Sequence, residues 1–267
     1  MHMRKLIKIA GFPVLLCFVL LSCKKNSKET LVEPVSQDVL AQIAALGFST
    51  DNVQPHSEGY LVEGDIVITK EHLNSKPEKL TMRIAEVEQY RTYNLVTGLP
   101  RNITIRVASS LPARYVTAVN SAISRYNALG LRITFSRVTS GGNIVINPAP
   151  SGSGYLASAG FPTSSGNPYS SVLVNRSYLD TWNINTVTSI IAHEVGHCVG
   201  FRHTDYMNRA YSCGGSPVNE GASTVGAVHI PGTPTGPDAN SWMLACIGNG
   251  VNRPFNANDI IALNYVY

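Results

Sequence analysis

The amino-acid sequence predicts an α+β fold, and three stretches in its central part carry this prediction. Apolar residues alternate along 101–107, which is typical of a strand with one buried face. A helix is predicted to begin at Pro112 and to run to about Leu129. Two further strands are predicted at 131–138 and 143–146. The order strand, helix, strand, strand is that of an α+β domain.

Weaker patterns extend this fold in both directions. The other elements that we expect, in chain order, are a short amphipathic helix at 39–46, a strand at 59–69 before a polar stretch at 70–79, an edge strand at 154–161, a strand at 171–175, a helix at 185–199, and a last helix at 259–265 that Asn256 or Asn258 starts. Residues 204–241 show little periodicity but much Gly, Pro and Ser, which indicates a long functional loop.

The helix at 185–199 carries the pattern H-E-x-x-H-x-x-G-x-x-H, which begins at His193 and ends at His203. His193 and His197 stand one helical turn apart, so both imidazoles can reach one metal ion. Glu194 flanks the face that they share. Gly200 can adopt the positive φ of a sharp turn, which would return His203 to the metal as a third ligand.

Three histidines and one glutamate are the groups that a catalytic zinc site needs. Such a site leaves the fourth position open for a water, whose proton Glu194 can take as general base. A structural zinc would instead have four protein ligands, usually with cysteine among them. The nearby Cys198 projects about 100° around the helix from His197 and is poorly placed to ligate. The pattern therefore favours the open, catalytic site.

The N-terminus predicts export. Residues 1–22 combine a basic start with an apolar run that is too short to span a membrane, as in a signal peptide. The run ends in Leu20-Leu21-Ser22-Cys23, which resembles the lipobox of bacterial lipoproteins and implies lipidation at Cys23. The alternative is an ordinary signal peptide in which Cys23 is incidental. We expect a cell-envelope lipoprotein, in the periplasm or at the cell surface, unless processing releases it. The membrane contact would be the lipid alone.

The distribution of charge argues against nucleic-acid binding. Beyond the basic first 28 residues, the chain holds 15 Lys and Arg against 17 Asp and Glu. Residues 29–89 carry 11 acids and 4 bases, whereas residues 90–179 carry 8 bases and no acid. We expect the acidic segment to dock on the basic segment that comes after it in the chain. The alternative is two independently solvated surfaces.

Three cysteines come after Cys23, and they allow one disulfide in three possible pairings. Cys213–Cys246 is favoured, because it would constrain the long loop after the histidine motif. Cys198 is expected to be a small buried apolar residue.

From Arg101 onward the chain resembles the metzincins, zinc endopeptidases with a methionine turn below the metal. Ser241-Trp242-Met243 supplies a matching S-x-M 40 residues after His203, so Met243 is the candidate turn methionine. The segments that most resemble the bacterial dual-action HEIGH metallopeptidases, often lipoproteins, are 193–205, 241–246 and 258–263. The resemblance implies a twisted, mostly parallel sheet with an antiparallel edge strand, an active-site helix, a methionine turn and a C-terminal helix.

Two related families fit less well. Pappalysin-like metzincins also have a threonine after the third histidine, as Thr204 is here, but Asp205 departs from their aromatic residue. Astacins carry a tyrosine two residues after the turn methionine as a transition-state donor, and Ala245 stands there in this chain. Tyr206 and Tyr211 are the candidates for such a donor.

Residues 62–66, Val-Glu-Gly-Asp-Ile, resemble the F-E-G-D segment of astacin propeptides, whose aspartate fills the open zinc position. The resemblance implies that Asp65 is the zinc ligand of an inactive precursor. The alternative is a strand end with a solvated aspartate. We divide the chain into a signal peptide at 1–22, a tether and inhibitory pro-segment at 23–100, and a metzincin-like peptidase domain at 101–267. Cleavage is expected near Arg91 or Arg101.

The resemblance implies a monomeric Zn²⁺-dependent endopeptidase that hydrolyses proteins or peptides. An extended substrate would pair with the edge strand at 154–161. One alternative is a surface lipoprotein that keeps the zinc and binds a protein or glycan. The intact Glu194 argues against this, because a binding module has no need of a general base. Another alternative is an enzyme that only matures its own chain.

Overall fold

A computed structural model of the chain describes residues 34–74, 89–220, 227–234 and 237–267. The predicted signal peptide and Cys23 lie outside these residues. From Pro34 to Tyr267 the chain forms one unit. Among the described residues, no helix has both the length and the apolar character needed to cross a bilayer.

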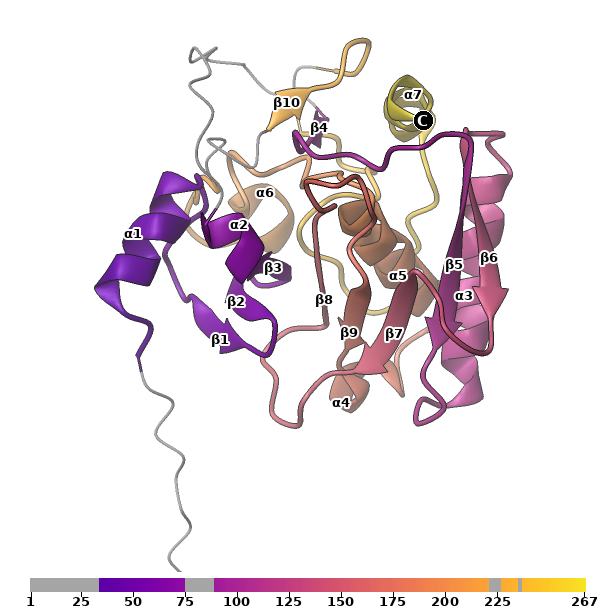
Figure 1. The fold of residues 1–267 in the computed structure, drawn as a ribbon, viewed down its shortest axis with the longest axis horizontal. Helices are drawn as coiled ribbons and strands as arrows, with labels where there is room; N and C mark the ends of the chain where they lie inside the picture. Colours follow the sequence, from indigo (N-terminus) through magenta and orange to yellow (C-terminus); the bar gives the residue numbers. More distant parts are fainter. Residues whose placement is uncertain (1–33, 75–88, 221–226, 235–236) are drawn as a thin grey trace, which may run out of the picture. The chain divides into compact units, whose positions relative to one another are not determined.

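An eight-stranded sheet forms the centre of the fold, with the strands in the order β1-β2-β3-β8-β9-β7-β5-β6 (Figure 1). Its strands are β1 (Gln54–His56), β2 (Gly59–Val62), β3 (Ile66–Thr69), β5 (Arg101–Val107), β6 (Ile133–Val138), β7 (Ile144–Pro148), β8 (Ala157–Gly160) and β9 (Ser171–Val174). Strands β6, β5, β7 and β9 run parallel to one another, β8 runs antiparallel to β9, and β1, β2 and β3 pair antiparallel at one edge of the sheet. The predicted α+β class, with a mostly parallel sheet and an antiparallel edge, is confirmed.

Two long helices, α3 (Ala113–Asn127) and α5 (Ile184–Cys198), pack against each other and against the sheet. The remaining elements are α1 (Gln37–Ala45), α2 (Lys70–Asn74), α4 (Arg176–Leu179), α6 (Ala210–Cys213), α7 (Ala257–Val266) and a two-stranded sheet of β4 (Tyr90–Arg91) and β10 (Val228–His229). Asn256 caps α7 in a capping box with Asp259. Of the two residues predicted to start this helix, Asn256 is therefore the one that does.

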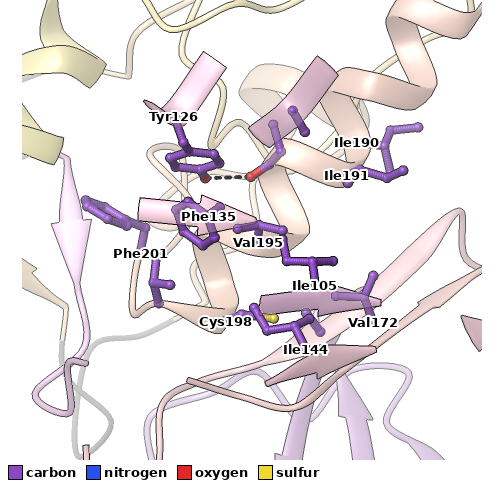
Figure 2. Close-up of a cluster of buried hydrophobic side chains, with 14 of the residues drawn as sticks. Ile105, Tyr126, Phe135, Ile144, Val172, Ile190, Ile191, Val195, Cys198 and Phe201 are labelled. Atoms are coloured by element: carbon purple, nitrogen blue, oxygen red, sulfur yellow. Dashed lines mark hydrogen bonds between the residues drawn. The ribbon is translucent and has the colours of Figure 1, made fainter. Parts of the chain in front are cut away.

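The main hydrophobic core lies between the sheet and the two long helices (Figure 2). Ile105 of β5, Phe135 of β6 and Val195 of α5 are all almost completely buried there. The hydroxyl of Tyr126 on α3 donates a hydrogen bond to the carbonyl oxygen of Ala192 on α5 at 2.7 Å. This bond and the surrounding apolar contacts fix the position of the helix that carries the histidines.

The histidine helix is buried more completely than its sequence pattern predicts. We expected one apolar side, but every residue from Thr186 to Cys198 is buried. The reason is that α3 and the sheet cover part of α5, while the segment around Trp242 and Met243 covers another part. A Cβ on Gly196 would lie only 2.7 Å from the Met243 sulfur.

The predicted strand at 59–69 is two strands joined by a tight turn. β2 and β3 pair antiparallel, with Val62 opposite Ile66. Glu63 and Gly64 both have positive φ, 56° and 89°, and this conformation reverses the chain between β2 and β3. Glu63 is also buried, so a strained non-glycine residue sits in the interior at this turn.

The prediction that residues 154–161 form an edge strand is wrong for this structure. β3 pairs with the outer side of β8 in parallel, with Ile66 opposite Ala159 and Val67 opposite Gly160. The amide of Ala159 donates to the carbonyl oxygen of Asp65 at 2.9 Å. An unpaired strand edge readily accepts a further strand, and here the N-terminal segment provides it.

The N-terminal segment docks on the 90–179 block as expected, through β8 and Phe161, but its ion pair is made outside that block. Glu63 lies 3.5 Å from Arg202, which is outside the basic block at 90–179. Apolar contacts add to this ion pair, because Phe48 stacks on Phe161 with ring centroids 6.3 Å apart. Ile43, Ile66 and other residues form a second, smaller core around them.

Candidate metal centre

Three histidines meet at the C-terminal end of α5. The rings of His193 and His197 lie one turn apart, with centroids separated by 4.6 Å. The helix ends at Cys198, and Gly200 then turns the chain with a φ of 105°. A Cβ on Gly200 would lie 2.8 Å from the Leu95 side chain, so the site excludes larger residues as well. After the turn, the Nε2 atoms of His203 and His197 are 3.2 Å apart.

Backbone carbonyl groups orient the first two histidines. Nδ1 of His193 lies 2.9 Å from the carbonyl oxygen of Trp242, and Nδ1 of His197 lies 2.8 Å from that of Phe201. A carbonyl oxygen can only accept, so each Nδ1 carries the hydrogen. Each Nε2 therefore presents a lone pair toward the other histidines, as a metal ligand must.

A carboxylate orients the third histidine. Nδ1 of His203 lies 3.0 Å from Glu220, and both side chains are fully buried. Arg209 and Arg202 lie 3.3 Å and 3.8 Å from the same carboxylate. Burial acts to raise the pKa of Glu220, but the charges of His203 and of the two arginines hold it below its usual value. Glu220 thus remains an anion in contact with His203.

Asp65 completes the group from the turn between β2 and β3. Its Oδ2 lies 3.1 Å from Nε2 of His203 and 3.7 Å from Nε2 of His193. One ligand atom from each of Asp65 and the three histidines lies within 4.8 Å of every other. The structure therefore brings together the three motif histidines and the aspartate of the N-terminal segment.

The chemistry of this group fits a metal ion. Nε2 of His193 is buried, and within the described chain it has no hydrogen-bond partner. The same holds for Oδ1 of Asp65 and Oε2 of Glu194. Buried polar atoms are normally paired, so unpaired ligand atoms that converge are what a metal site requires.

Glu194 lies beside this group with 2% of its surface exposed. Burial is the main cause that raises its pKa well above the usual value, and the nearby charge of Asp65 adds to the effect. A carboxylate that is buried and has a raised pKa is suited to accept a proton near neutral pH.

The segment Ser241–Met243 supports two of the histidines. Trp242 provides the carbonyl group that orients His193, and the carbonyl oxygen of Met243 accepts from the amide of Thr204 at 2.9 Å. Met243 is 1% exposed, and its sulfur packs against α5 at Gly196.

The structure joins Cys213 of α6 to Cys246 in a disulfide. Cys198 is a free, buried thiol in the main core, and burial raises its pKa well above the usual value. Neither tyrosine considered as a transition-state donor lines the cavity beside Glu194. Tyr206 is buried edge-on against Tyr90, and Tyr211 is 45% exposed on α6.

Several contributing residues lie outside the sequence motifs. Glu220 comes from the irregular loop, 17 residues after His203, in a stretch without periodicity. Asp259 of α7 accepts from the amide of Trp242 at 3.1 Å and from the hydroxyl of Ser241 at 2.9 Å. A lone acid in an irregular loop gives no signal in a single sequence. Asp259 lies in the helix start that resembles the metallopeptidase family, but that resemblance does not reveal its hydrogen bonds to Ser241 and Trp242.

A family model matches most of the chain. Residues 60–267 match the family model described as the dual-action HEIGH metallo-peptidase. Among solved structures, one described as the structure of myroilysin is similar, with a TM-score of 0.41 and 16% sequence identity. The similarity covers 65% of this chain and 82% of that chain. A search of curated proteins finds no match.

Proposed function

The chain belongs to the dual-action HEIGH metallo-peptidase family, and we propose that it is a zinc-dependent endopeptidase made as an inactive precursor. The family is the one predicted from the histidine helix and the methionine segment. The observation that carries the proposal is the convergence of three imidazoles with Glu194 beside them. Proteins or peptides are the substrates that a peptidase implies.

His193, His197 and His203 would hold the zinc, because their Nδ1 atoms are engaged elsewhere and their Nε2 atoms converge. Nitrogen ligands from three histidines suit zinc, and three protein ligands are typical of catalytic zinc sites. When bound, zinc would polarise the scissile carbonyl group and acidify a water molecule. The packing of Met243 below α5 supports membership of the metzincin clan.

Glu194 is the general base in this proposal. Its carboxylate takes a proton from the water whose oxygen attacks the carbonyl carbon of the substrate. It then gives that proton to the nitrogen of the leaving amine as the peptide bond breaks. The burial of Glu194 supports this role. Among the described residues, the other acid on the wall of the cavity is Asp65, which belongs to the N-terminal segment.

The N-terminal segment supports the precursor half of the proposal in two ways. Asp65 sits where it can fill the remaining metal position, 3.1 Å from Nε2 of His203. β3 also takes the side of β8 with which an extended substrate would pair. The segment would therefore block both the metal and the substrate edge until it leaves.

We place the start of the mature enzyme before Gln89, rather than near Arg91 or Arg101. Nε2 of Gln89 donates to Asp259 at 2.5 Å, and the amide of Thr92 donates to the carbonyl oxygen of Gly200 at 2.8 Å. These contacts join residues 89–100 to the histidine turn and to α7. Cleavage after them would remove supports of the metal centre.

Export and lipidation are also part of the proposal, based on residues 1–23 alone. The expected protein is a monomer held to the cell envelope by a lipid on Cys23. Mass spectrometry of the exported chain should show a mass increase that Cys23→Ser abolishes.

The test of catalysis uses residues 24–267, with zinc content and cleavage of casein and of the chain itself as readouts. Glu194→Gln should keep the zinc and lower cleavage by about 10²-fold or more. Glu71→Gln, which changes an exposed carboxylate bonded to Ser164, is the matched control and should change neither readout. Zinc binding without any cleavage that depends on Glu194, before or after removal of the N-terminal segment, would favour the binding module. Cleavage limited to the chain itself would favour self-maturation.

The test of the precursor is Asp65→Ala. Removal of this carboxylate should free the metal position and give a precursor that cleaves casein before processing, but more slowly than the processed form, because β3 still covers β8. Asp51→Ala, at an exposed position, is the control. A precursor that stays silent after Asp65→Ala, but whose processed form is active, would exclude Asp65 as the inhibiting group.

A further inference from the structure

A cavity of about 260 Å³ opens beside the metal centre. It lies between α5, the loop that leads into β8, and the segment after Met243. A cavity of about 150 Å³ can hold a benzene ring, so this one has room for a complete amino-acid side chain.

The N-terminal segment does not fill this cavity. Its residues on the cavity wall are Gly64, which has no side chain, and Asp65, whose carboxylate points to His203. The cavity therefore belongs to the part of the chain that remains after the segment leaves. Glu194 also lies on its wall, so whatever occupies it sits next to the reacting bond.

Most of the wall is apolar, but it carries two arginines. Ile190, Leu244 and Ile247 contribute apolar side chains. Arg209 is neutralised locally, because it lies 3.3 Å from Glu220. Arg253 differs in this respect: within the described residues, no carboxylate oxygen lies within 4 Å of its side-chain nitrogens.

Arg253 is held in place, and within the described residues most of its guanidinium donors have no hydrogen-bond partner. One Nη donates to the carbonyl oxygen of Cys246 at 2.7 Å, and its backbone amide donates to the hydroxyl of Ser189 at 2.9 Å. The acid that acts on it most is Asp205, whose two oxygens already accept from Ala245 and Ser212. A guanidinium has five N–H donors in a planar fork that matches a carboxylate.

We propose that this cavity receives the substrate side chain next to the scissile bond, and that Arg253 makes it select an acidic one. The apolar walls contact the methylene groups of an aspartate or glutamate, and the guanidinium binds the carboxylate. The inference rests on the proposed peptidase activity. It adds the class of residue at which the enzyme cuts.

The experiment measures kcat/KM for peptides that differ only in Glu or Gln at each position flanking the cleaved bond. The enzyme is used in the form that cleaves casein, either the processed chain or the unprocessed Asp65→Ala chain. At one flanking position the parent enzyme should prefer Glu over Gln by about tenfold or more, since hydrogen bonds to charged groups discriminate by this amount. Arg253→Gln should bring that ratio close to one.

Two further variants separate selection from folding. Arg253→Lys keeps the charge and should keep part of the preference for Glu, even if it cleaves more slowly. Arg137→Gln removes an arginine of β6 that bonds to Asn120 and should leave the ratio unchanged. Equal rates for Glu and Gln in an active parent enzyme would overturn this inference and leave the peptidase standing. A preference that survives Arg253→Gln would do the same. An enzyme that cleaves no peptide or casein would overturn both proposals.

Discussion

At the scale of single residues, the site depends on hydrogen bonds that point each histidine inward. Trp242, Phe201 and Glu220 each engage one Nδ1 atom. Two of these partners are backbone carbonyl groups, which no substitution can remove directly. Glu220 instead acts through its side chain, which can be substituted without changing any of the three histidines.

Glu220→Gln should weaken metal binding, because the neutral amide orients His203 less well and makes it a poorer donor. We expect the dissociation constant for zinc to rise by about 10- to 100-fold, measured by competition with a chelator on folded protein. Glu71→Gln is again the control. An unchanged dissociation constant in the folded Glu220→Gln variant would show that the backbone places His203 without help from Glu220.

Residue-scale chemistry was the most predictable part of this protein. The spacing of His193 and His197 follows from helix geometry, and the turn at Gly200 follows from its backbone freedom. Both features depend only on residues that are close together in the chain, so the sequence pattern predicts them. The contact of His203 with Glu220 is also close in sequence, but the intervening loop has no regular geometry from which to predict it.

At the scale of elements, α7 holds the methionine segment through Asp259. Its carboxylate accepts from the hydroxyl of Ser241 and from the amides of Trp242 and Asn256. The carbonyl group of Trp242 in turn orients His193. The last helix thereby supports the metal centre through one buried acid.

This buried acid should give stability a distinct pH dependence. Burial raises the pKa of Asp259 to about 6, although its hydrogen-bond donors act to lower it. The folded protein therefore binds this proton more tightly than the unfolded chain does. The resulting stability is complete below about pH 4 and is lost as the pH rises through about 6, a change of about 3 kcal/mol.

Denaturant unfolding of the parent protein and of Asp259→Asn at pH 4 and pH 6.5 tests this. Between these pH values, the parent should lose about 2 kcal/mol relative to the Asn variant, whose side chain does not titrate. Asp51→Asn, at the surface, should show no such relative change. A constant difference between parent and Asp259→Asn would contradict the raised pKa.

From residue 101 onward most strands and helices lie where the sequence patterns predict them, because periodic apolar residues mark their buried faces. The N-terminal segment departs from its pattern, since the turn at Glu63 and Gly64 interrupts an apparently continuous strand. The alternation of apolar residues continues across that turn, so periodicity could not reveal it.

At the scale of the whole molecule, the N-terminal segment joins the sheet of the peptidase part and has its own small core. Phe48 anchors it, with Phe161 stacked on one side and Arg202 4.8 Å from its ring centroid. These contacts hold β3 on β8 independently of the Asp65 carboxylate.

Phe48→Ala should loosen this segment, because removing a buried phenylalanine costs about 3–5 kcal/mol. We expect the unprocessed precursor to gain casein-cleaving activity although Asp65 is intact. Phe135→Ala makes a similar cavity in the main core and should destabilise the protein without activating it. If both variants behave alike, the contact of Phe48 does not hold the N-terminal segment in place.

The sequence by itself determined the chemistry: the three histidines and Glu194 lie within eleven residues, and helix periodicity with one glycine turn places them. Only the tertiary structure decided what surrounds them. Glu220, Asp259, Arg253 and the pairing of β3 with β8 reach the site through contacts between distant or irregular segments. Such contacts depend on how elements pack, and the pattern of a single chain does not encode them locally.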